Sequence, residues 1–265
     1  MVSTKSARRA GVPLVVIETA DPQQSIRNII TEDFNGKFEE IPVMIWDIVR
    51  ALCPMNRKGA EAIAQIAGAG SPQIETQNPT QCLTLLQKAP PDSVIFFLNT
   101  HRFWDNEMVM QGIWNLRDPF KGDGSMLVMM VPPSSPLPVE LKNDTIVLVD
   151  PLPTLEEIKG VVTSTAKAGK ITEIPQKERI IDALTGLSAF NAEQVFAMSI
   201  GKDRSVDVDA VWEKKRSVIE QTPGLSVWRG GEKFSEIGGS DNVKSFFRSL
   251  FTGVKPPKAI VFMDE

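Results

Sequence analysis

Two adjacent carboxylates, Asp264 and Glu265, form the pair of residues in this chain that is most suited to chemistry. They follow the apolar run Ile260–Met263, which predicts a buried strand that ends where the acidic pair begins. Because open α/β sheets bind ligands at the carboxyl ends of their strands, both side chains would face a ligand there. Asp264 could hold the Mg²⁺ of a nucleotide, mostly through water, and Glu265 could orient and activate an attacking water. Apolar strands that end in Asp-Glu also occur without such chemistry, so a purely structural role stays open.

The elements that must position this pair begin at a glycine-containing segment, residues 234–240. After it, Asp241 can cap a strongly amphipathic helix, because apolar residues follow at i, i+3, i+4, i+7 and i+8: Val243, Phe246, Phe247, Leu250 and Phe251. Two prolines then separate this helix from the strand predicted over 259–263. A glycine linker that opens a capped helix explains these residues without any ligand.

Segment 236–244, Glu-Ile-Gly-Gly-Ser-Asp-Asn-Val-Lys, resembles the entry to an AAA+ ATPase module. In that family an acidic-Ile-Gly-Gly stretch precedes the first helix, and its backbone reaches the adenine. The resemblance implies that Ile237 and Gly238 line the adenine pocket, since glycine lets a backbone approach a flat ligand. It also makes the final strand similar to a Walker B element, with Asp264 on the metal and Glu265 catalytic. The family usually has Asp where this chain has Glu236, which is a mild departure.

The residue counts exclude much other chemistry. The chain has one histidine, His101, no tyrosine, and two cysteines, Cys53 and Cys82. Multi-histidine and cysteine-rich metal sites are therefore excluded, and so is a disulfide framework. This cysteine usage indicates a reducing compartment, so we expect a cytoplasmic protein. A formal net charge of -4, from 29 basic and 33 acidic residues, argues against a protein that coats nucleic acid by charge alone.

No targeting or membrane segment is predicted. The apolar run Val12–Ile17 follows basic residues, but it is short, contains Pro13 and ends at Glu18. It fits a buried strand better than a secretory signal. No stretch approaches the ~20 consecutive apolar residues of a membrane helix.

Five short apolar runs predict the strands of one sheet. Within each run the apolar residues do not alternate with polar ones, which is typical of parallel strands covered on both faces. The segments between the runs are long enough for crossover helices. We therefore predict the α/β class, with a parallel five-stranded sheet over Leu14–Ile17, Val43–Trp46, Val94–Leu98, Met126–Val131 and Ile146–Val149.

Helices replace strands after Asp150. Thr154 and Glu157 form a capping-box pattern, and apolar residues follow them at helical spacing. Three further helices are predicted, over residues 177–185, from Asn191 onward and along the apolar stripe from Val208 to Ile219.

Three further stretches resemble one AAA+ branch, in which a degenerate ATPase-like module precedes the working one. They are Trp46-Asp47, residues 97–105 and residues 150–158, and the branch includes a plastid-encoded family and phage-borne relatives. The resemblance covers most of the chain. It implies a P-loop-NTPase-like (AAA+) α/β core over residues 1–150, a helical lid over 151–224, a linker over 225–239 and the start of a second AAA+ module over 240–265.

The first of these modules is predicted not to hydrolyse ATP. A P-loop has the pattern G-x-x-x-x-G-K-[ST], and the segment after the first strand, Glu18–Ser25, has neither glycine nor lysine. Where a working module would have an acidic pair, Asn99-Thr100 follows the third predicted strand. The neighbouring His101 is more typical of a structural than of a catalytic histidine.

No P-loop pattern occurs anywhere in the 265 residues. Two explanations stay open: an additional Walker-B-like strand precedes a P-loop further downstream, or the P-loop segment has been lost. The sequence stops on a predicted buried strand without a polar tail, so we expect it to be the N-terminal part of a longer protein.

Two functions therefore stay open. In the first, the complete protein is an AAA+ ATPase that uses ATP and Mg²⁺ to remodel a macromolecule and forms a homo-hexamer, while the present chain is not itself catalytic. In the second, the chain is a non-enzymatic adaptor or assembly module with a degenerate nucleotide site. The sequence indicates neither a membrane nor a nucleic acid as a partner. The downstream sequence separates the two functions, because an ATPase requires a P-loop there.

Overall fold

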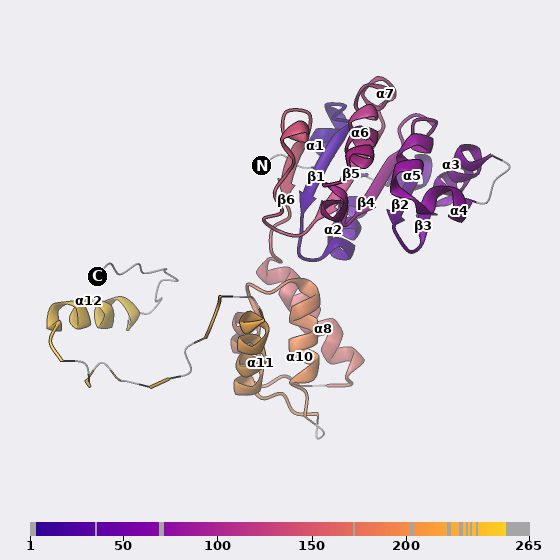
Figure 1. Ribbon diagram of the computed structural model, residues 1–265. Helices are drawn as coiled ribbons and strands as arrows, with labels where there is room; N and C mark the ends of the chain where they lie inside the picture. The colour runs from indigo at the N-terminus through magenta and orange to yellow at the C-terminus, as the bar shows by residue number, and fades with distance from the viewer. Residues whose placement is uncertain are drawn as a thin grey trace. The chain divides into compact units, whose positions relative to one another are not determined.

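Two compact units, Met1–Lys215 and Arg216–Glu265, make up the computed structural model. In the larger unit, a sheet with helices against its faces is followed along the chain by a group of helices (Figure 1). The structure describes residues 4–34, 36–68, 72–171, 173–201, 204–221, 224–227, 230–231, 233, 235–236 and 238–252.

The sheet is mostly parallel. Its six strands are β1 Leu14–Glu18, β2 Val43–Asp47, β3 Ala51–Pro54, β4 Val94–Leu98, β5 Met126–Val131 and β6 Ile146–Val149. They lie in the order β3-β2-β4-β5-β1-β6, and every neighbouring pair is parallel except β2 and β3. All five predicted strands are present, which confirms the α/β class. The antiparallel edge strand β3 is an addition that the sequence does not predict.

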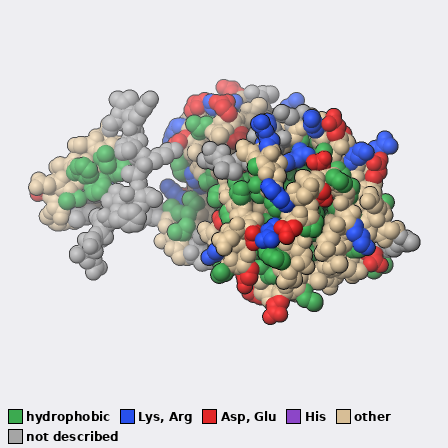
Figure 2. Space-filling model, turned by 90° about the horizontal axis from the view of Figure 1, so that it is seen from above, with side chains coloured by type: hydrophobic (Ala, Val, Ile, Leu, Met, Phe, Trp, Pro, Cys, Tyr) green, Lys and Arg blue, Asp and Glu red, His purple; other side chains and the backbone are tan. Residues whose placement is uncertain are grey.

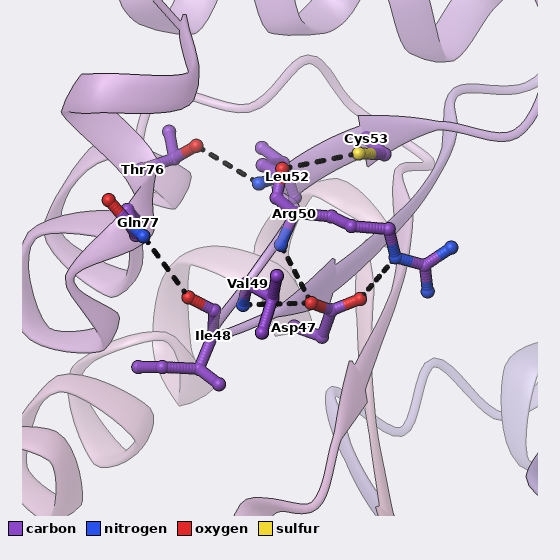
Figure 3. Close-up of polar contacts among 8 residues, drawn as sticks. All are labelled: Asp47, Ile48, Val49, Arg50, Leu52, Cys53, Thr76 and Gln77. Carbon is purple, nitrogen blue, oxygen red and sulfur yellow. Dashed lines mark hydrogen bonds and ion pairs between the residues drawn. The ribbon is translucent and has the colours of Figure 1, made fainter.

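A tight turn after β2 creates this additional strand. The Asp47 carboxylate accepts hydrogen bonds from the backbone N–H of Val49 at 2.9 Å and of Arg50 at 2.8 Å (Figure 3). Its other oxygen lies 2.5 Å from Arg50 Nε. On β3, the N–H of Leu52 donates to the Thr76 hydroxyl at 3.0 Å. A short strand made by such a turn has no long apolar run to reveal it.

Seven helices of the described residues belong to the α/β core. They are α1 Thr4–Arg9, α2 Pro22–Asn28, α3 Arg57–Ala67, α4 Pro72–Gln77, α5 Pro79–Leu86, α6 Glu107–Asn115 and α7 Arg117–Asp123. A π-helical turn, η1 Ile29–Asp33, continues α2, and the 3-10 turns are η2 Lys37–Glu40, η3 Thr100–Phe103 and η4 Val139–Leu141. Asp21 caps α2, because its side chain accepts the N–H of Gln24, and Pro22 occupies the first turn of the helix.

Both faces of the sheet are buried along β1, β2, β4 and β5, as their unbroken apolar runs predict. The same expectation is wrong for the edge strand β6, where Val147 is 43% and Val149 is 65% exposed. On β1, Val16 belongs to one apolar cluster and its neighbour Val15 to the other. The first cluster joins the sheet to α3, α5, α6 and α7, and the second joins it to α1 and α2. Within the first cluster, the rings of Trp46 and Phe97 stack with their centroids 4.0 Å apart.

Four helices follow the core, as predicted: α8 Leu155–Ala168, α9 Lys177–Leu184, α10 Ala189–Met198 and α11 Val208–Glu220. The capping box at the start of α8 is confirmed. Thr154 Oγ1 accepts the N–H of Glu157 at 3.3 Å, and Glu157 Oε2 accepts the N–H of Thr154 at 2.7 Å. Buried side chains such as Ile158 on α8 and Phe196 on α10 form the apolar interior of this helical group.

The smaller unit contains the amphipathic helix α12, Asp241–Phe251, which confirms the predicted helix. The prediction that Asp241 caps it is wrong. Ser240 precedes the helix without a side-chain cap, and Asp241 lies in the first turn, 3.6 Å from Lys244 Nζ. The apolar face stays open within the described residues, because Phe246 is 61% exposed and no residue of α12 is buried.

Acidic and basic side chains are interspersed on the face of the larger body that Figure 2 shows. Proteins that bind nucleic acid through charge gather basic side chains on one face. The mixture seen here agrees with the small net charge of -4. None of the helices in the described part of the chain is long and apolar enough to cross a membrane.

Candidate functional site

A cavity of about 430 Å³ opens at the carboxyl ends of β1, β5 and β6. The chain leaves β1 toward β2 on one side and leaves the neighbouring β5 toward β6 on the other. Open α/β sheets bind ligands where two adjacent strands part in opposite directions in this way. The cavity, here called the switch-point pocket, is lined by residues 18–21, Pro133 and residues 149–153, with further residues of α2, α8 and α10.

Two buried hydroxyls and one carboxylate fasten the loop after β1. Thr19 and Ser25 are 4% and 2% exposed, and their hydroxyl oxygens lie 2.7 Å apart. Asp150 Oδ2 accepts a hydrogen bond from Thr19 at 3.0 Å and another from Ser25. Thr19 Oγ1 also accepts the backbone N–H of Asp21 at 3.0 Å. Because buried polar groups without partners cost about 1–3 kcal/mol, this Thr19–Ser25–Asp150 cluster stabilises the loop.

The same loop lacks the residues of a phosphate-binding loop. Laid over residues 18–25, the pattern G-x-x-x-x-G-K-[ST] meets Glu18 and Gln23 in place of glycine and Gln24 in place of lysine. Ser25 matches, but its hydroxyl is held in the cluster. No lysine or arginine is found among the described residues that line the pocket. The described lining therefore supplies no cationic side chain to compensate the charge of a nucleoside triphosphate.

Four carboxylates line the switch-point pocket, and the chain itself supplies partners for each of them. Asp150 accepts the two hydroxyls, and Asp21 Oδ1 caps α2 by accepting a backbone N–H at 3.1 Å. Glu18 Oε2 accepts a backbone N–H of the loop after β5 at 2.9 Å, and Glu157 belongs to the capping box. Across the described residues there is no group of three or more histidine, cysteine or acidic side chains that could hold a metal ion.

The turn after β4 contains polar residues where a working ATPase module would have an acidic pair. Asn99 has a left-handed backbone with φ 55°, and the buried Thr100 hydroxyl donates to the carbonyl of Phe97 at 2.9 Å. His101 Nδ1 is buried and has no hydrogen-bond partner within the described residues. Burial and the nearby charge of Arg102 lower the pKa of His101, so this histidine is neutral at pH 7.

Asp47, at the carboxyl end of β2, is also held by the fold. Its partial burial opposes ionisation, but hydrogen bonds from the backbone N–H groups of Arg50 and Val49 and the Arg50 guanidinium lower the pKa of Asp47. The carboxylate therefore stays ionised within the turn of Figure 3. It is a structural group of the β2–β3 connection.

Most of the residues predicted to bind ATP lie outside the described residues. Ile237, Asp264 and Glu265 are in this group, so their roles stay predictions, as does the strand over 259–263. Gly238 is described and exposed, and a Cβ built on it would have nothing within 4 Å. Within the described residues, no side chain lies beside Gly238 to form a binding site with it.

Sequence reasoning missed the Thr19–Ser25–Asp150 cluster. Part of the cluster could have been found from the sequence, because Thr19 directly follows β1 and Asp150 directly follows β6. Parallel strands bring such positions to one edge of the sheet. Ser25 gives no such signal, since its approach to Asp150 depends on where α2 begins.

Comparison with known families gives two matches along the chain. The model of the N-terminal domain of SpoVK-like AAA ATPases matches residues 4–149, and the model of their second domain matches residues 156–222. The uncharacterized AAA domain-containing protein ycf46 of Guillardia theta is 23% identical over 246 residues, which are 91% of this chain and 46% of that protein. The ycf46 protein of Trieres chinensis is 23% identical over 250 residues, or 92% and 47% of the two chains. The chain thus spans about half the length of these curated relatives.

Two solved structures are similar to the chain with TM-scores below 0.5. A RuvB protein of Thermotoga maritima has a TM-score of 0.47 at 16% identity, covering 84% of this chain and 69% of that one. The AAA domain of FIGL-1 in complex with ADP has a TM-score of 0.47 at 12% identity, covering 90% and 78%. The match to the N-terminal domain alone includes more than half of the residues, and the chain therefore belongs to the SpoVK-like AAA ATPase family.

Proposed function

We propose that the chain is the N-terminal part of an AAA+ ATPase, and that its first module is a degenerate copy that does not hydrolyse ATP. The observation that carries this proposal is the switch-point pocket. It lies where an α/β sheet binds its ligand, but no lysine or arginine lines its described part and the loop after β1 has no glycine. The proposed divisions are an α/β core over residues 1–150, a lid over 151–224, a linker over 225–239 and a second module that begins at 240.

In this proposal the first module serves assembly or recognition, and the complete protein hydrolyses ATP to remodel a macromolecule. The family uses a nucleotide, typically with Mg²⁺, and typically forms oligomeric rings. We infer a homo-hexamer for the complete protein. A cytoplasmic location is part of the proposal, and the free thiols of Cys53 and Cys82 support it.

The proposed ATPase residues belong to the second module. Asp264 would hold the Mg²⁺ of ATP, Glu265 would activate the attacking water, and Ile237 and Gly238 would lie against the adenine. The support is their order in the sequence, where an Ile-Gly-Gly entry, an amphipathic helix and an apolar strand with two terminal carboxylates follow one another. The bound metal would supply charge compensation for the phosphates.

A second candidate function is a non-enzymatic adaptor or assembly module. The observation that favours it is the absence of the pattern G-x-x-x-x-G-K-[ST] from all 265 residues. Both candidates predict that the 265-residue chain alone does not hydrolyse ATP. They differ in the activity of the complete protein.

Calorimetric titration of the 265-residue chain with Mg²⁺-ATP tests the degenerate first module. We expect no heat of binding up to ~1 mM nucleotide, which corresponds to a binding free energy of about -4 kcal/mol. The physical reason is that no lysine or arginine lines the described part of the switch-point pocket to compensate the charge of the phosphates. Saturable binding or steady hydrolysis by this chain would contradict the proposal.

Substitution of Glu265 in the complete protein tests the ATPase assignment. Glu265→Gln is expected to lower the hydrolysis rate by about 10²-fold or more while ATP binding persists, because the side chain keeps its shape but loses its basicity. Glu193→Gln, which removes one exposed carboxylate of α10, is the matched control and is expected to keep full activity. Equal rates for the two variants would remove Glu265 from the proposal, and no hydrolysis by the unaltered complete protein would favour the adaptor.

A further inference from the structure

A second cavity of about 430 Å³ lies beside α6 and has a different lining. Aromatic, thioether and acidic side chains from the segment after η3, from α6 and from η4 surround it. We call it the α6 pocket, and the residues that matter here are Trp104, Asp105, Glu107, Met110, Trp114 and Glu140.

The three carboxylates of the α6 pocket have no partner in the part of the chain that the structure describes. Among the described residues, neither a hydrogen bond nor an ion pair reaches the side chain of Asp105, Glu107 or Glu140. No lysine or arginine is present in the described lining. Like charges gathered around one cavity raise the local concentration of cations, since field lines concentrate in a low-dielectric cleft.

The two indole rings add a surface that suits a cation. Trp104 Nε1 is buried and lacks a hydrogen-bond partner among the described residues. Trp114 is 40% exposed, and its Nε1 donates to Asp144 Oδ2 at 3.2 Å, which fixes the ring. The guanidinium carbon of Arg117 lies 4.6 Å from the centroid of the Trp114 ring. This contact shows within the chain itself that a guanidinium can stack on Trp114.

Arg117 does not neutralise the α6 pocket. Its guanidinium is paired with Asp118 at 2.9 Å and with Asp144 at 3.0 Å, and it is not among the residues that line the cavity. The charge of Arg117 is therefore balanced by carboxylates outside the pocket. Arg117 therefore gives no ion pair to Asp105, Glu107 or Glu140.

We propose that the α6 pocket binds a basic side chain, arginine or lysine, of a partner protein. The hydrocarbon stem of such a side chain would lie against Met110 and the indole rings, and its charged head would meet the carboxylates. Two strongly exposed apolar residues adjoin the acidic ones in sequence: Met108 follows Glu107 and is 64% exposed, and Val139 precedes Glu140 and is 74% exposed. These exposed apolar side chains favour a polypeptide over a free amine, because a polypeptide can cover them with neighbouring residues.

Indole resonances of the ¹⁵N-labelled 265-residue chain provide the test. The probes are capped arginine, capped lysine and capped norleucine, which has the stem of lysine without its charge. We expect arginine and lysine to shift the indole N–H signals of Trp104 and Trp114 with a Kd of about 1 mM, and norleucine to bind at least about tenfold more weakly. Equal shifts by norleucine, or no shift with any probe at ~10 mM, would overturn the proposal.

Matched variants distinguish binding of arginine in the α6 pocket from a general effect of surface charge. The double variant Glu107→Gln/Glu140→Gln is expected to weaken arginine binding about five- to tenfold, as two partly exposed charges are lost. The double variant Glu39→Gln/Glu193→Gln changes the net charge equally at exposed positions outside the pocket, and should bind like the unaltered chain. The unchanged indole spectrum of each free variant reports that the fold is intact. Equal weakening in both variants would contradict a specific site.

The source of the cation is tested with two further probes. A capped leucine-arginine-leucine tripeptide is expected to bind more tightly than capped arginine, because its flanking leucines can cover Met108 and Val139. Spermidine carries more charge but no such apolar groups. If spermidine binds more tightly than the tripeptide, the assignment to a protein partner is wrong.

Discussion

The switch-point pocket and the α6 pocket resemble each other in size and charge, but their polar groups have different partners. Each has a volume of about 430 Å³, and carboxylates without lysine or arginine line the described part of each. In the switch-point pocket, backbone N–H groups and hydroxyls of the chain bind every carboxylate. In the α6 pocket, Asp105, Glu107 and Glu140 have no partner among the described residues. Groups of the first kind stabilise the fold, whereas groups of the second kind are available to a ligand.

The difference extends to the residues around each pocket. Of the buried side-chain atoms that lack a hydrogen-bond partner in the described chain, two belong to η3 and the residue after it: His101 Nδ1 and Trp104 Nε1. At the switch-point pocket the buried hydroxyls of Thr19 and Ser25 are both satisfied. The usual ligand position of an α/β sheet is therefore used for structure in this module. The buried polar atoms that lack a partner in the described chain lie instead at the turn after β4 and at Thr145, which precedes β6.

The largest expected effect separates the two pockets by stability. Asp150→Ala should lower the free energy of unfolding by about 2 kcal/mol, because it removes the charged acceptor of two buried hydroxyls. Glu140→Ala, a loss of one carboxylate in the α6 pocket, should change it by less than about 0.5 kcal/mol. Urea unfolding followed by circular dichroism measures both. Equal losses would show that the carboxylates of the two pockets do not differ in their structural role.

A smaller effect on stability is expected from a change of pH, which acts through His101 in the turn after β4. Burial and Arg102 lower the pKa of His101 in the folded chain, whereas the unfolded chain has the ordinary value near ~6.5. The unfolded state therefore binds the proton more readily. The stability that neutral His101 contributes is complete above the unfolded pKa and is lost as the pH falls through ~6.5 toward the folded pKa.

The variant His101→Gln isolates this contribution. Urea midpoints at about pH 7.5 and about pH 5.5 should differ less for His101→Gln than for the unaltered chain. Asp47 also has a lowered pKa, but its loss of stability begins below the ordinary aspartate range of ~3.9 and so falls outside this window. Identical pH dependence in the two chains would mean that His101 is not desolvated as its surroundings imply.

Much of the fold was predictable because most of its parallel strands are buried on both faces. Runs such as Met126–Val131 contain no polar residue, which is typical of a covered strand. Gly59 gives a misleading signal, since a glycine soon after a proline such as Pro54 is typical of a loop. The structure places Gly59 inside α3, where a Cβ would lie 2.2 Å from the carbonyl oxygen of Val43. The glycine permits close packing of α3 against β2, and sequence alone does not distinguish this role from a turn.

The position of the switch-point pocket was easier to predict from the sequence than the contacts among its residues. The parallel sheet that the sequence predicts brings the ends of β1 and β6 to one edge, where α/β folds bind ligands. The partners of Asp150 depended on the loop conformation, which no periodic pattern encodes. The α6 pocket was missed entirely, because Trp104 and Glu140 are far apart in sequence and meet only after β5 and η4 have returned the chain to α6.

The smallest expected effect is a gain in stability at the α6 pocket. Glu107→Gln/Glu140→Gln should raise the free energy of unfolding by up to about 0.5 kcal/mol, because it relieves repulsion among unpartnered carboxylates. Urea unfolding at low and high salt measures the change, and the gain should shrink at high salt because ions screen exposed charges. Glu39→Gln/Glu193→Gln controls for net charge. A loss of more than about 1 kcal/mol would mean that these carboxylates hold the fold as Asp150 does, since surface groups without partners do not give losses of that size. The free energy of unfolding should thus fall for Asp150→Ala and rise slightly for Glu107→Gln/Glu140→Gln. These opposite signs distinguish a pocket whose carboxylates are bound by the chain's own hydrogen bonds from one that is open to a cation.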